Sequence, residues 1–225
     1  AGRDHYVSVG FVDSRAVVIH NGIDTRRFAP DTKSGVRFRA LWRIPERALL
    51  IGLVGRLHPL KDHHTFLRAA ARFAHTRPDA RFVCIGGGSE KYLHDLREFA
   101  DRLGLSNRVS WTGFILDDMR GAYNALNICC SSSSTEGTSN AIGEAMACGV
   151  PCVVTDVGDS KLIIGETGVL VPPKNPEALS AGLAVMAERL NENPRLPHAV
   201  RERIESRLGI AALVCKTSET LLGLL

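Results

Sequence analysis

Several features that would point to a particular class of protein are missing from this sequence. No apolar run approaches the ~20 residues that a membrane-spanning helix needs. The first ten residues, AGRDHYVSVG, lack the apolar core of a signal peptide. Aromatic residues make up only 6%, and no dense cluster of Lys and Arg is interleaved with them, which argues against nucleic acid as a partner. These absences predict a protein of the cytoplasm that does not bind nucleic acid.

Metal-binding signatures are missing as well. The chain has six cysteines, but none of them forms a Cys-x-x-Cys pair. Cys148 and Cys152 are four residues apart, yet no nearby His or second Cys pair completes a zinc site. Most cysteines stand inside apolar runs such as RFVCIG and NICCS, where a free Cys behaves as a small buried hydrophobe. We therefore expect reduced, buried thiols and no metal site.

The composition is otherwise that of an ordinary globular protein. Hydrophobic residues make up 44% of the 225 residues and charged residues 23%, which is enough to build a core and argues against disorder. The formal net charge of +4 is mildly basic and allows an anionic ligand. No low-complexity segment or internal repeat is visible.

Short apolar runs rich in β-branched residues alternate with helical patterns. The runs are mostly continuous, which is typical of strands in a sheet that is covered on both faces. They predict strands over residues 16–20, 48–55, 80–86, 108–113, 126–131, 151–156 and 168–173. The intervening patterns predict helices over residues 62–76, 90–103, 117–125, 139–148 and 176–190, with only helices beyond residue 176. The alternation predicts an α/β fold with a doubly wound parallel sheet.

Ligands of such sheets bind at the carboxyl ends of the strands, so the loops that follow the strands are where a site is expected. Arg56 and Lys61 fall in the first such loop, before a helix that begins near Asp62. Two cations beside a helix N-terminus can form an anion site, because the free N–H groups of the helix add to the charge-assisted bonds. A solvated loop with ordinary surface charges has the same spacing, so both interpretations stay open.

Two other loops favour a structural role. Gly86 to Gly88 follow a strand like a dinucleotide fingerprint, but Lys91 occupies the third glycine position. A tight strand-to-helix turn capped by Ser89 or a neighbour is the better interpretation. The stretch VIHNGIDTRRFAP predicts a strand and then a turn at Asn21-Gly22, with Asp24 and Thr25 as local caps.

The stretch SSSSTEGTSNAIGEAMACG carries two carboxylates eight residues apart, Glu136 and Glu144. A helix is expected to start at Thr138 or Ser139, and the unpaired N–H groups of its first turn favour phosphate. On this helix Glu144 lies on an arc with Gly143 and Ala147 that is nearly bare of bulk, so a ligand could approach it closely. A carboxylate can accept two bonds side by side, which suits the vicinal hydroxyls of a ribose. The alternative is an exposed Glu on a helix that packs against another backbone.

Five stretches closely resemble, in this order, the carboxyl-terminal half of the family 4 retaining glycosyltransferases of the GT-B fold. They are HNGIDTRRFAP, GLVGRLHPLKDHHTFLRAA, FVCIGGGSE, WTGFILDDM and STEGTSNAIGEAMACGVPCVVTDVGD. The resemblance covers roughly residues 5–225, and its most specific element is the pair Glu136 and Glu144 followed by EAMACGVPCVVT. Arg56 and Lys61 match the family's Gly-Arg-x4-Lys phosphate site. The loop after Glu136 departs from the family pattern. It has the sequence GTSN, whereas GF or GY followed by Gly or Pro is commoner in the family.

The resemblance implies a role for each of these residues. Arg56 and Lys61 would hold the diphosphate of a nucleotide sugar, Glu144 would accept bonds from the ribose hydroxyls, and Glu136 would lie near the donor sugar. Backbone amides that bind sugar or phosphate would come from Gly137, Thr138, Ser139 and Asn140. The loop expected against the base contains Gly113, Phe114 and Ile115. The resemblance implies no cofactor and no metal, and a UDP-, GDP- or ADP-sugar as co-substrate.

The resemblance also implies a domain organisation. Residues 1–15 would be the tail of an absent amino-terminal domain, residues 16–208 the Rossmann-like nucleotide-sugar-binding domain, and residues 209–225 a crossover helix. The absent domain would carry the acceptor site and any peripheral contact with a membrane, so the chain alone is expected to transfer little sugar. The apolar face of the last helix would lack its partner, and self-association through this helix is expected.

Two other kinds of function remain open alongside the donor-binding domain of a retaining hexosyltransferase. One is a non-catalytic module that binds a nucleotide or nucleotide sugar. The other is a different enzyme on the same scaffold, such as an NAD-linked oxidoreductase or a nucleotide-sugar epimerase. The missing third glycine, and the lack of an acidic residue at the proper distance, argue against NAD.

Overall fold

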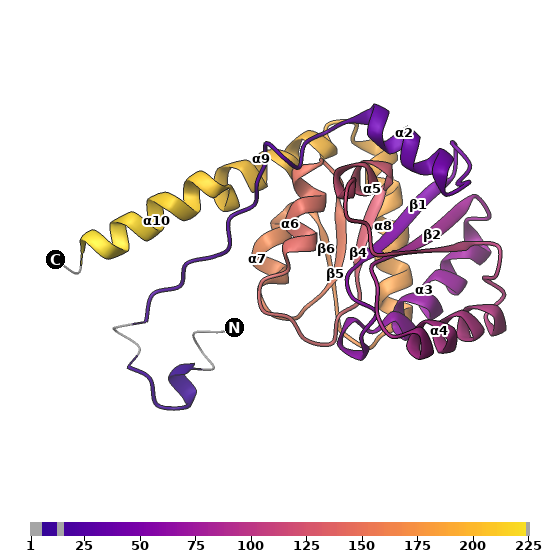
Figure 1. The fold of residues 1–225 in the computed structure, drawn as a ribbon, viewed down its shortest axis with the longest axis horizontal. Coiled ribbons are helices and arrows are strands. Elements are labelled where there is room, and N and C mark those ends of the chain that lie inside the picture. Colours follow the sequence, from indigo (N-terminus) through magenta and orange to yellow (C-terminus); the bar gives the residue numbers. More distant parts are fainter. Residues whose placement is uncertain (1–5, 13–15, 224–225) are drawn as a thin grey trace.

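The computed structural model describes residues 6–12 and 16–223, which include one six-stranded sheet with helices on both faces (Figure 1). The order across the sheet is β3-β2-β1-β4-β5-β6, and every neighbouring pair is parallel. The chain winds outward from β1 in one direction and from β4 in the other, which is the doubly wound, Rossmann-like order. The strands are β1 (Leu49–Val54), β2 (Ala80–Ile85), β3 (Val109–Gly113), β4 (Ile128–Ser131), β5 (Cys152–Thr155) and β6 (Val169–Val171).

The helices form a layer on each side of this sheet. On one face α3 packs against α8, and on the other α2 packs against α5 and α6 against α9. The helices are α2 (Thr32–Leu41), α3 (His63–Thr76), α4 (Glu90–Arg102), α5 (Met119–Ala125), α6 (Asn140–Ala147), α7 (Ser160–Ile164), α8 (Pro176–Glu192), α9 (Leu196–Leu208) and α10 (Ile210–Leu222). Two short 3-10 turns are η2 (Pro59–Lys61) and η3 (Gly165–Thr167).

The central strands are buried on both faces, as their continuous apolar sequence predicts. In β1 the side chains of Leu50, Ile51 and Leu53 are at most 2% exposed. Five of the six cysteines are free and buried, and Cys215 on α10 is exposed. The predicted α/β class, its parallel sheet and its helices on both faces are confirmed. Six predicted strands and five predicted helices lie within two residues of their predicted limits.

The strand predicted over residues 16–20 is wrong. These residues are extended but belong to no strand of the described sheet, whose edges are β3 and β6. Val17 is 57% exposed and Val18 42% exposed. The β-branched run has the composition of a strand, but no sheet edge lies beside it to supply partners for its backbone. Only Ile23, further along the chain, forms an isolated bridge, with Gly209.

Helix α2 was not predicted, because Gly35 in its middle lowers the local helix propensity. The structure gives this glycine a packing role: a Cβ there would lie 2.4 Å from the carbonyl oxygen of Asn124 in α5. Asp31 caps the helix by accepting from the amide of Ser34 at 3.1 Å. The five-residue helix α7 was also missed. Tertiary packing against neighbouring helices therefore decided both elements.

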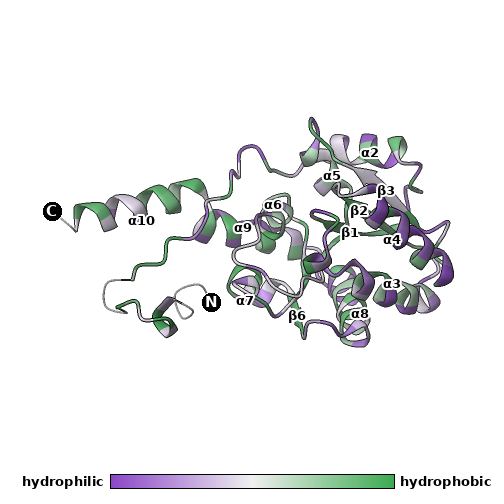
Figure 2. Ribbon diagram, turned by 60° about the horizontal axis from the view of Figure 1, so that its bottom comes forward, coloured by the Kyte–Doolittle hydropathy of each residue, from purple (hydrophilic) through white to green (hydrophobic). Residues whose placement is uncertain are grey.

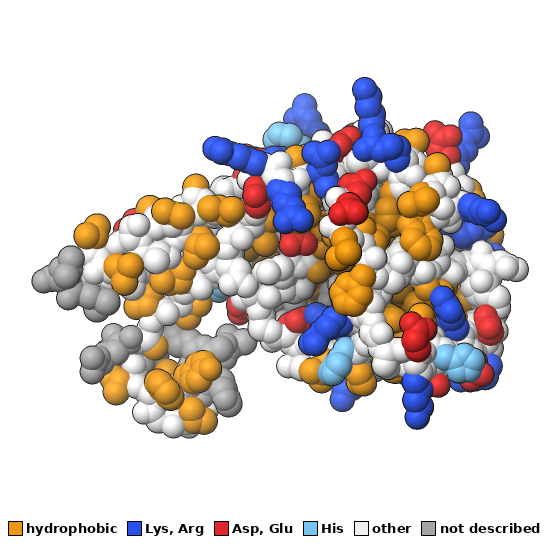
Figure 3. Space-filling view, viewed as in Figure 1, with side chains coloured by type: hydrophobic (Ala, Val, Ile, Leu, Met, Phe, Trp, Pro, Cys, Tyr) orange, Lys and Arg blue, Asp and Glu red, His pale blue; other side chains and the backbone are white. Residues whose placement is uncertain are grey.

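Helix α10 extends away from the rest of the molecule at the carboxyl end of the described chain (Figure 1). It has no buried residue, and Ile210, Val214, Leu221 and Leu222 are 46% to 69% exposed. Hydrophobic positions are prominent along α10 (Figure 2), and orange apolar side chains lie along it in the space-filling view (Figure 3). Self-association through this helix stays a prediction. In the described ranges no helix is both long and apolar enough to cross a bilayer.

We expect Gly86→Ala to lower the free energy of unfolding by more than about 2 kcal/mol, because it combines backbone strain with a steric clash. Gly86 has φ +136°, and an added Cβ would lie 2.1 Å from the carbonyl oxygen of Gly55. Gly104 is the matched control, since its φ is +72° but no atom lies within 4 Å of an added Cβ. Gly104→Ala should cost only about 1 kcal/mol. Urea denaturation of both variants measures the difference, and equal losses would contradict the packing role of Gly86.

Candidate functional site

The candidate site lies where the winding of the sheet reverses, between β1 and β4. These two strands are neighbours in the sheet, with Ile51 opposite Ile128 and Leu53 opposite Cys130. Because the strands are parallel, the loops that follow them emerge at the same edge. This reversal point is where open α/β sheets bind their ligands. The loops at residues 55–62 and 132–139 therefore meet at the expected place.

Serine side chains and a salt bridge join these two loops. The hydroxyl of Ser132 donates to the carbonyl oxygens of Lys61 at 2.8 Å and of Asp62 at 2.9 Å. Lys61 Nζ forms a salt bridge with Glu136 Oε1, and Ser133 Oγ donates to the same oxygen at 2.7 Å. The amide of Ser134 donates to the carbonyl of Leu60 at 2.8 Å. The structure thus gives the serine run a bracing role that sequence reasoning missed.

Lys61 and Glu136 are only 25% and 13% exposed, so their contact is partly shielded from water. An anion that enters here meets an ammonium group that already has a partner. It must share Lys61 with Glu136 or displace it. The structure thus places two of the candidate site residues in direct contact.

Arg56 is placed differently from Lys61. It is exposed, and no ion pair or side-chain hydrogen bond of Arg56 is found among the described residues. It borders a cavity of about 400 Å³ on the β2 side, together with Leu57, His58, Gly88 and Ser89. The structure therefore brings Lys61 to Glu136 but leaves Arg56 at the rim, free to reorient toward a ligand.

The glycine-rich turn after β2 has a steric explanation. A Cβ on Gly87 would lie 2.2 Å from the ring of Phe114, and one on Gly88 would lie 2.5 Å from the carbonyl oxygen of Leu57. Ser89 caps α4 by accepting from the amide of Tyr92 at 3.2 Å, as predicted. These glycines allow close packing of neighbouring loops, so the turn needs no dinucleotide to explain it.

The loop between Glu136 and α6 is held by the turn after β5. Thr138 Oγ1 donates to Asp159 Oδ2 at 2.8 Å, and the amide of Asp159 donates to the carbonyl of Gly137 at 3.0 Å. Gly158, at φ +56°, lies beneath this loop, where a Cβ would be 2.3 Å from the oxygen of Gly137. Ser139 is the N-cap residue, but its side chain makes no capping bond. Among the described residues, the first turn of α6 thus lacks a hydrogen bond from the side chain of its N-cap residue.

Glu144 lies one turn further along α6 and is half-buried. The hydroxyl of Tyr123, on α5, donates to Glu144 Oε2 at 2.7 Å. Burial raises the pKa of the Glu144 carboxyl above its ordinary value, while the Tyr123 bond and the charge of Arg27 oppose this rise. The carboxylate is thus held in place, and one of its oxygens already has a protein partner.

The bare arc predicted beside Glu144 is wrong. Gly143 and Ala147 are both buried, and a Cβ on Gly143 would lie 2.7 Å from Ile23. The small residues leave room for the segment at residues 21–28 rather than for a ligand. The helix packs here against the side chain of Ile23, and Glu144 is half-buried, so the alternative of an exposed Glu is not confirmed either. Sequence periodicity placed the arc correctly and could not show what covers it.

The segment before α2 supplies polar groups that sequence reasoning treated as structural. Asn21 Nδ2 donates to Asn140 Oδ1 at 3.1 Å, and His20 Nδ1 lies 3.5 Å from Asp159 Oδ2. Asp24 Oδ1 accepts from the amides of residues 26 and 27 at 3.0 Å each, which confirms its predicted role as a cap. The sequence feature that could have indicated His20 and Asn21 is that this polar pair directly follows an apolar run.

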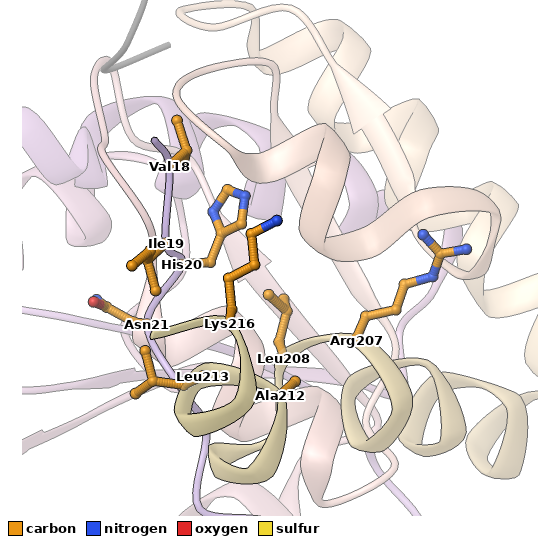
Figure 4. Close-up of a pocket in the computed structure, with 9 residues that line it drawn as sticks. All are labelled: Val18, Ile19, His20, Asn21, Arg207, Leu208, Ala212, Leu213 and Lys216. Atoms are coloured by element: carbon orange, nitrogen blue, oxygen red, sulfur yellow. The ribbon is translucent and has the colours of Figure 1, made fainter. Parts of the chain in front are cut away.

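A cavity of about 310 Å³ lies behind His20, between residues 18–21 and helices α9 and α10 (Figure 4). Lys216 of α10 points toward the His20 ring, whereas Arg207 points away (Figure 4). Leu213 also lines this cavity, and its side chain lies 3.0 Å from where a Cβ on Gly22 would be. The last helix therefore approaches the back of the candidate site and adds positive charge there.

The residues expected against the base lie at the end of β3. Phe114 is 72% exposed and Ile115 is half-buried, and both border a cavity of about 300 Å³ with Phe38 and Trp42. The Phe114 ring lies against Gly87, whose carbonyl oxygen accepts from the amide of Leu57 at 2.8 Å. The loop after β3 therefore borders the glycine turn that contacts the Arg56 loop. Across the described residues, no group of three His, Cys, Asp or Glu side chains could hold a metal ion.

Residues 48–189 match the family model described as Glycosyl transferases group 1. This chain belongs to that family. A relative among the group 1 transferases, the D-inositol 3-phosphate glycosyltransferase of Salinispora tropica, is 33% identical over 188 residues, which are 76% of this chain and 38% of the relative. The chain therefore spans about two fifths of that relative's length.

Solved structures of glycosyltransferases share the group 1 domain's fold. HepE of Anabaena, in a crystal structure in complex with UDP, superposes with a TM-score of 0.91 at 22% identity, over 99% of this chain and 62% of HepE. The C-terminal domain of a glycosyl transferase group 1 family protein (LpcC) from Francisella tularensis has a TM-score of 0.75 at 25% identity, over 84% of this chain and all of that domain. The predicted fold, one half of a GT-B fold, is confirmed.

We expect Glu144→Gln to raise the free energy of unfolding at neutral pH but hardly at about pH 4. A raised carboxyl pKa favours the protonated form, so its stabilising contribution is present at low pH and is lost as the pH rises through the folded-state pKa. Gln keeps an acceptor for the Tyr123 hydroxyl. Urea titrations at both pH values measure the effect, with the exposed Glu192→Gln as control. A Glu144→Gln variant that is less stable than the wild type at neutral pH would contradict this assignment.

Proposed function

We propose that this chain is the donor-binding domain of a retaining, family 4 glycosyltransferase and that it binds a nucleotide-diphospho-sugar at the β1–β4 edge. One observation supports the proposal: Lys61 pairs with Glu136 where the loops after β1 and β4 meet, and the start of α6, the helix that carries Glu144, follows in the same loop. A cation and a helix N-terminus suit a diphosphate, and a carboxylate one helical turn away suits a sugar hydroxyl. Membership of the glycosyl transferases group 1 supports this proposal.

The diphosphate is the leaving group of sugar transfer, so negative charge grows on it as the glycosidic bond breaks. Lys61, Arg56 and the first-turn N–H groups of α6 would stabilise that charge most if they are already oriented toward it. The bracing of both loops by Ser132 and Thr138 provides this preorganisation. Glu136 would lie near the donor sugar, where its bond to Lys61 couples the sugar side of the site to the phosphate side.

The nucleoside would extend from Glu144 toward β3. Glu144 would accept a bond from the ribose, and the loop Gly113 to Ile115 would contact the base. Phe114 offers an exposed aromatic face for this contact. The solved HepE complexes contain UDP and UDP-glucose, which makes a UDP-sugar the first donor to test.

The acceptor would bind on chain outside these 225 residues. The relatives matched here are much longer, and this chain spans 38% of the Salinispora tropica transferase and 62% of HepE. Transfer without a metal ion, a hexose as the sugar and a cytoplasmic location are parts of the same proposal. Little transfer is expected from the chain by itself.

The proposal is tested by calorimetry of the chain with UDP, GDP and ADP. At least one of them should bind, and Lys61→Met should weaken that binding about tenfold or more, because a charge-assisted bond to phosphate is lost. The exposed Lys33→Met is the matched control and should bind like the wild type. Absence of binding by all three nucleotides to a folded chain would overturn the proposal.

A second experiment tests the assignment of Glu144 to the ribose. Glu144→Gln should weaken nucleoside diphosphate binding about tenfold and leave inorganic pyrophosphate binding unchanged, since pyrophosphate has no ribose to contact. Glu192→Gln should change neither affinity. Equal losses for nucleotide and pyrophosphate would place Glu144 against the phosphates instead.

A further inference from the structure

One hydroxyl group touches the Glu144 carboxylate from behind. Tyr123 Oη donates to Glu144 Oε2 at 2.7 Å, a contact between two helices whose residues are 21 positions apart in the sequence. No hydrogen bond to Glu144 Oε1 is found within residues 6–12 and 16–223. The carboxylate therefore presents one oxygen that is occupied and one that is available.

The donor of this bond is rigidly held. Tyr123 is 1% exposed, and its ring packs edge-on against Phe28 with 5.7 Å between ring centroids. Helix α5, which carries it, is capped by Asp118, whose Oδ1 accepts from the amide of Gly121 at 2.7 Å. Burial raises the pKa of Tyr123 well above its ordinary value, so the hydroxyl keeps its proton and remains a donor.

A Glu side chain has several rotatable bonds, and ordering it when a ligand binds costs conformational entropy. A partner that orders it beforehand removes this cost from the binding step. Tyr123 is placed to do this, because its own side chain is fixed by the core while Glu144 is only half-buried.

The charged and titratable groups around Glu144 come from several elements. Arg27, in the segment before α2, acts on its carboxylate, and burial raises the pKa of Cys148, the C-cap residue of α6, to about 12. From α9, Arg201 donates to the carbonyl of Ala147 at the end of α6. The strands beneath α6 have the sequences ICCS and CVVT and add no charged side chain. The Tyr123 hydroxyl and the Arg27 guanidinium are therefore the groups that act on the Glu144 carboxylate.

We propose that Tyr123 is a positioning residue for donor binding: it holds Glu144 Oε2 so that Oε1 is oriented to accept a hydrogen bond from the ribose. The inference rests on the proposed role of Glu144. Tyr123 itself does not touch the ligand, because its hydroxyl is buried behind the carboxylate.

Tyr123→Phe removes the hydroxyl and keeps the ring. We expect it to weaken binding of the nucleoside diphosphate about two- to tenfold, the usual worth of one hydrogen bond, and to leave pyrophosphate binding unchanged. A double-mutant cycle measured by calorimetry decides whether the effect passes through Glu144. In the Glu144→Gln background, Tyr123→Phe should cost little further nucleotide affinity. An equal loss in both backgrounds would overturn the inference.

The pH profile of nucleotide binding is the readout that a purely structural role would not move. Nucleotide affinity should fall at acidic pH as Glu144 becomes protonated, and we call this fall the acid limb of the binding profile. The Tyr123 bond lowers the Glu144 pKa, so its loss should shift the acid limb to higher pH. Titration of the ligand phosphate is common to all variants and cancels in the comparison. Phe28→Leu, which disturbs the same packing but keeps the hydroxyl, should lower thermal stability and leave the limb where it is.

The outcomes separate the two proposals. If Glu144→Gln leaves nucleotide binding intact, the ribose assignment fails and the inference falls with it. If Glu144→Gln weakens nucleotide binding while the acid limb of Tyr123→Phe coincides with the wild-type limb, only the positioning role is overturned.

Discussion

The joined loops after β1 and β4 are the constraint on which the candidate site depends. Ser132 bonds to the backbone of residues 61 and 62, and Lys61 pairs with Glu136. These contacts fix the distance between a cation and a carboxylate that are 75 residues apart in the sequence. Without them each loop would be a solvated connection, and the charge-stabilising groups of the proposed function would not be preorganised.

Close approach of backbones is the second theme of the site. Gly86, Gly88 and Gly158 each lie where a side chain would collide with a neighbouring carbonyl oxygen. Gly143 likewise leaves room for Ile23, in the segment whose Asn21 bonds to Asn140 at the start of α6. Side-chain volume is therefore absent from this edge for packing reasons, and the space that remains is left to exposed groups such as Arg56 and Phe114.

The proposed role of Glu144 requires an energetic compromise. Its burial disfavours the charged form, yet an ionised carboxylate is the better acceptor for a sugar hydroxyl. Tyr123 and Arg27 reduce this cost without removing it. An uncharged residue here would avoid this cost of burial.

The sequence by itself determined the alternation of strands and helices, the parallel sheet, the loops that carry Arg56, Lys61 and Glu136, and the helix that carries Glu144. It could do so because continuous apolar runs and helical periodicity are local signals, and because parallel strands end at a common edge. Only the tertiary structure decided that residues 16–20 remain unpaired, that Gly35 belongs to a helix, and that Ile23 covers the arc beside Glu144. It also decided the bond from Tyr123 to Glu144. Each of these depends on which segment lies alongside another, and such contacts between distant parts of the chain leave no periodicity in the sequence.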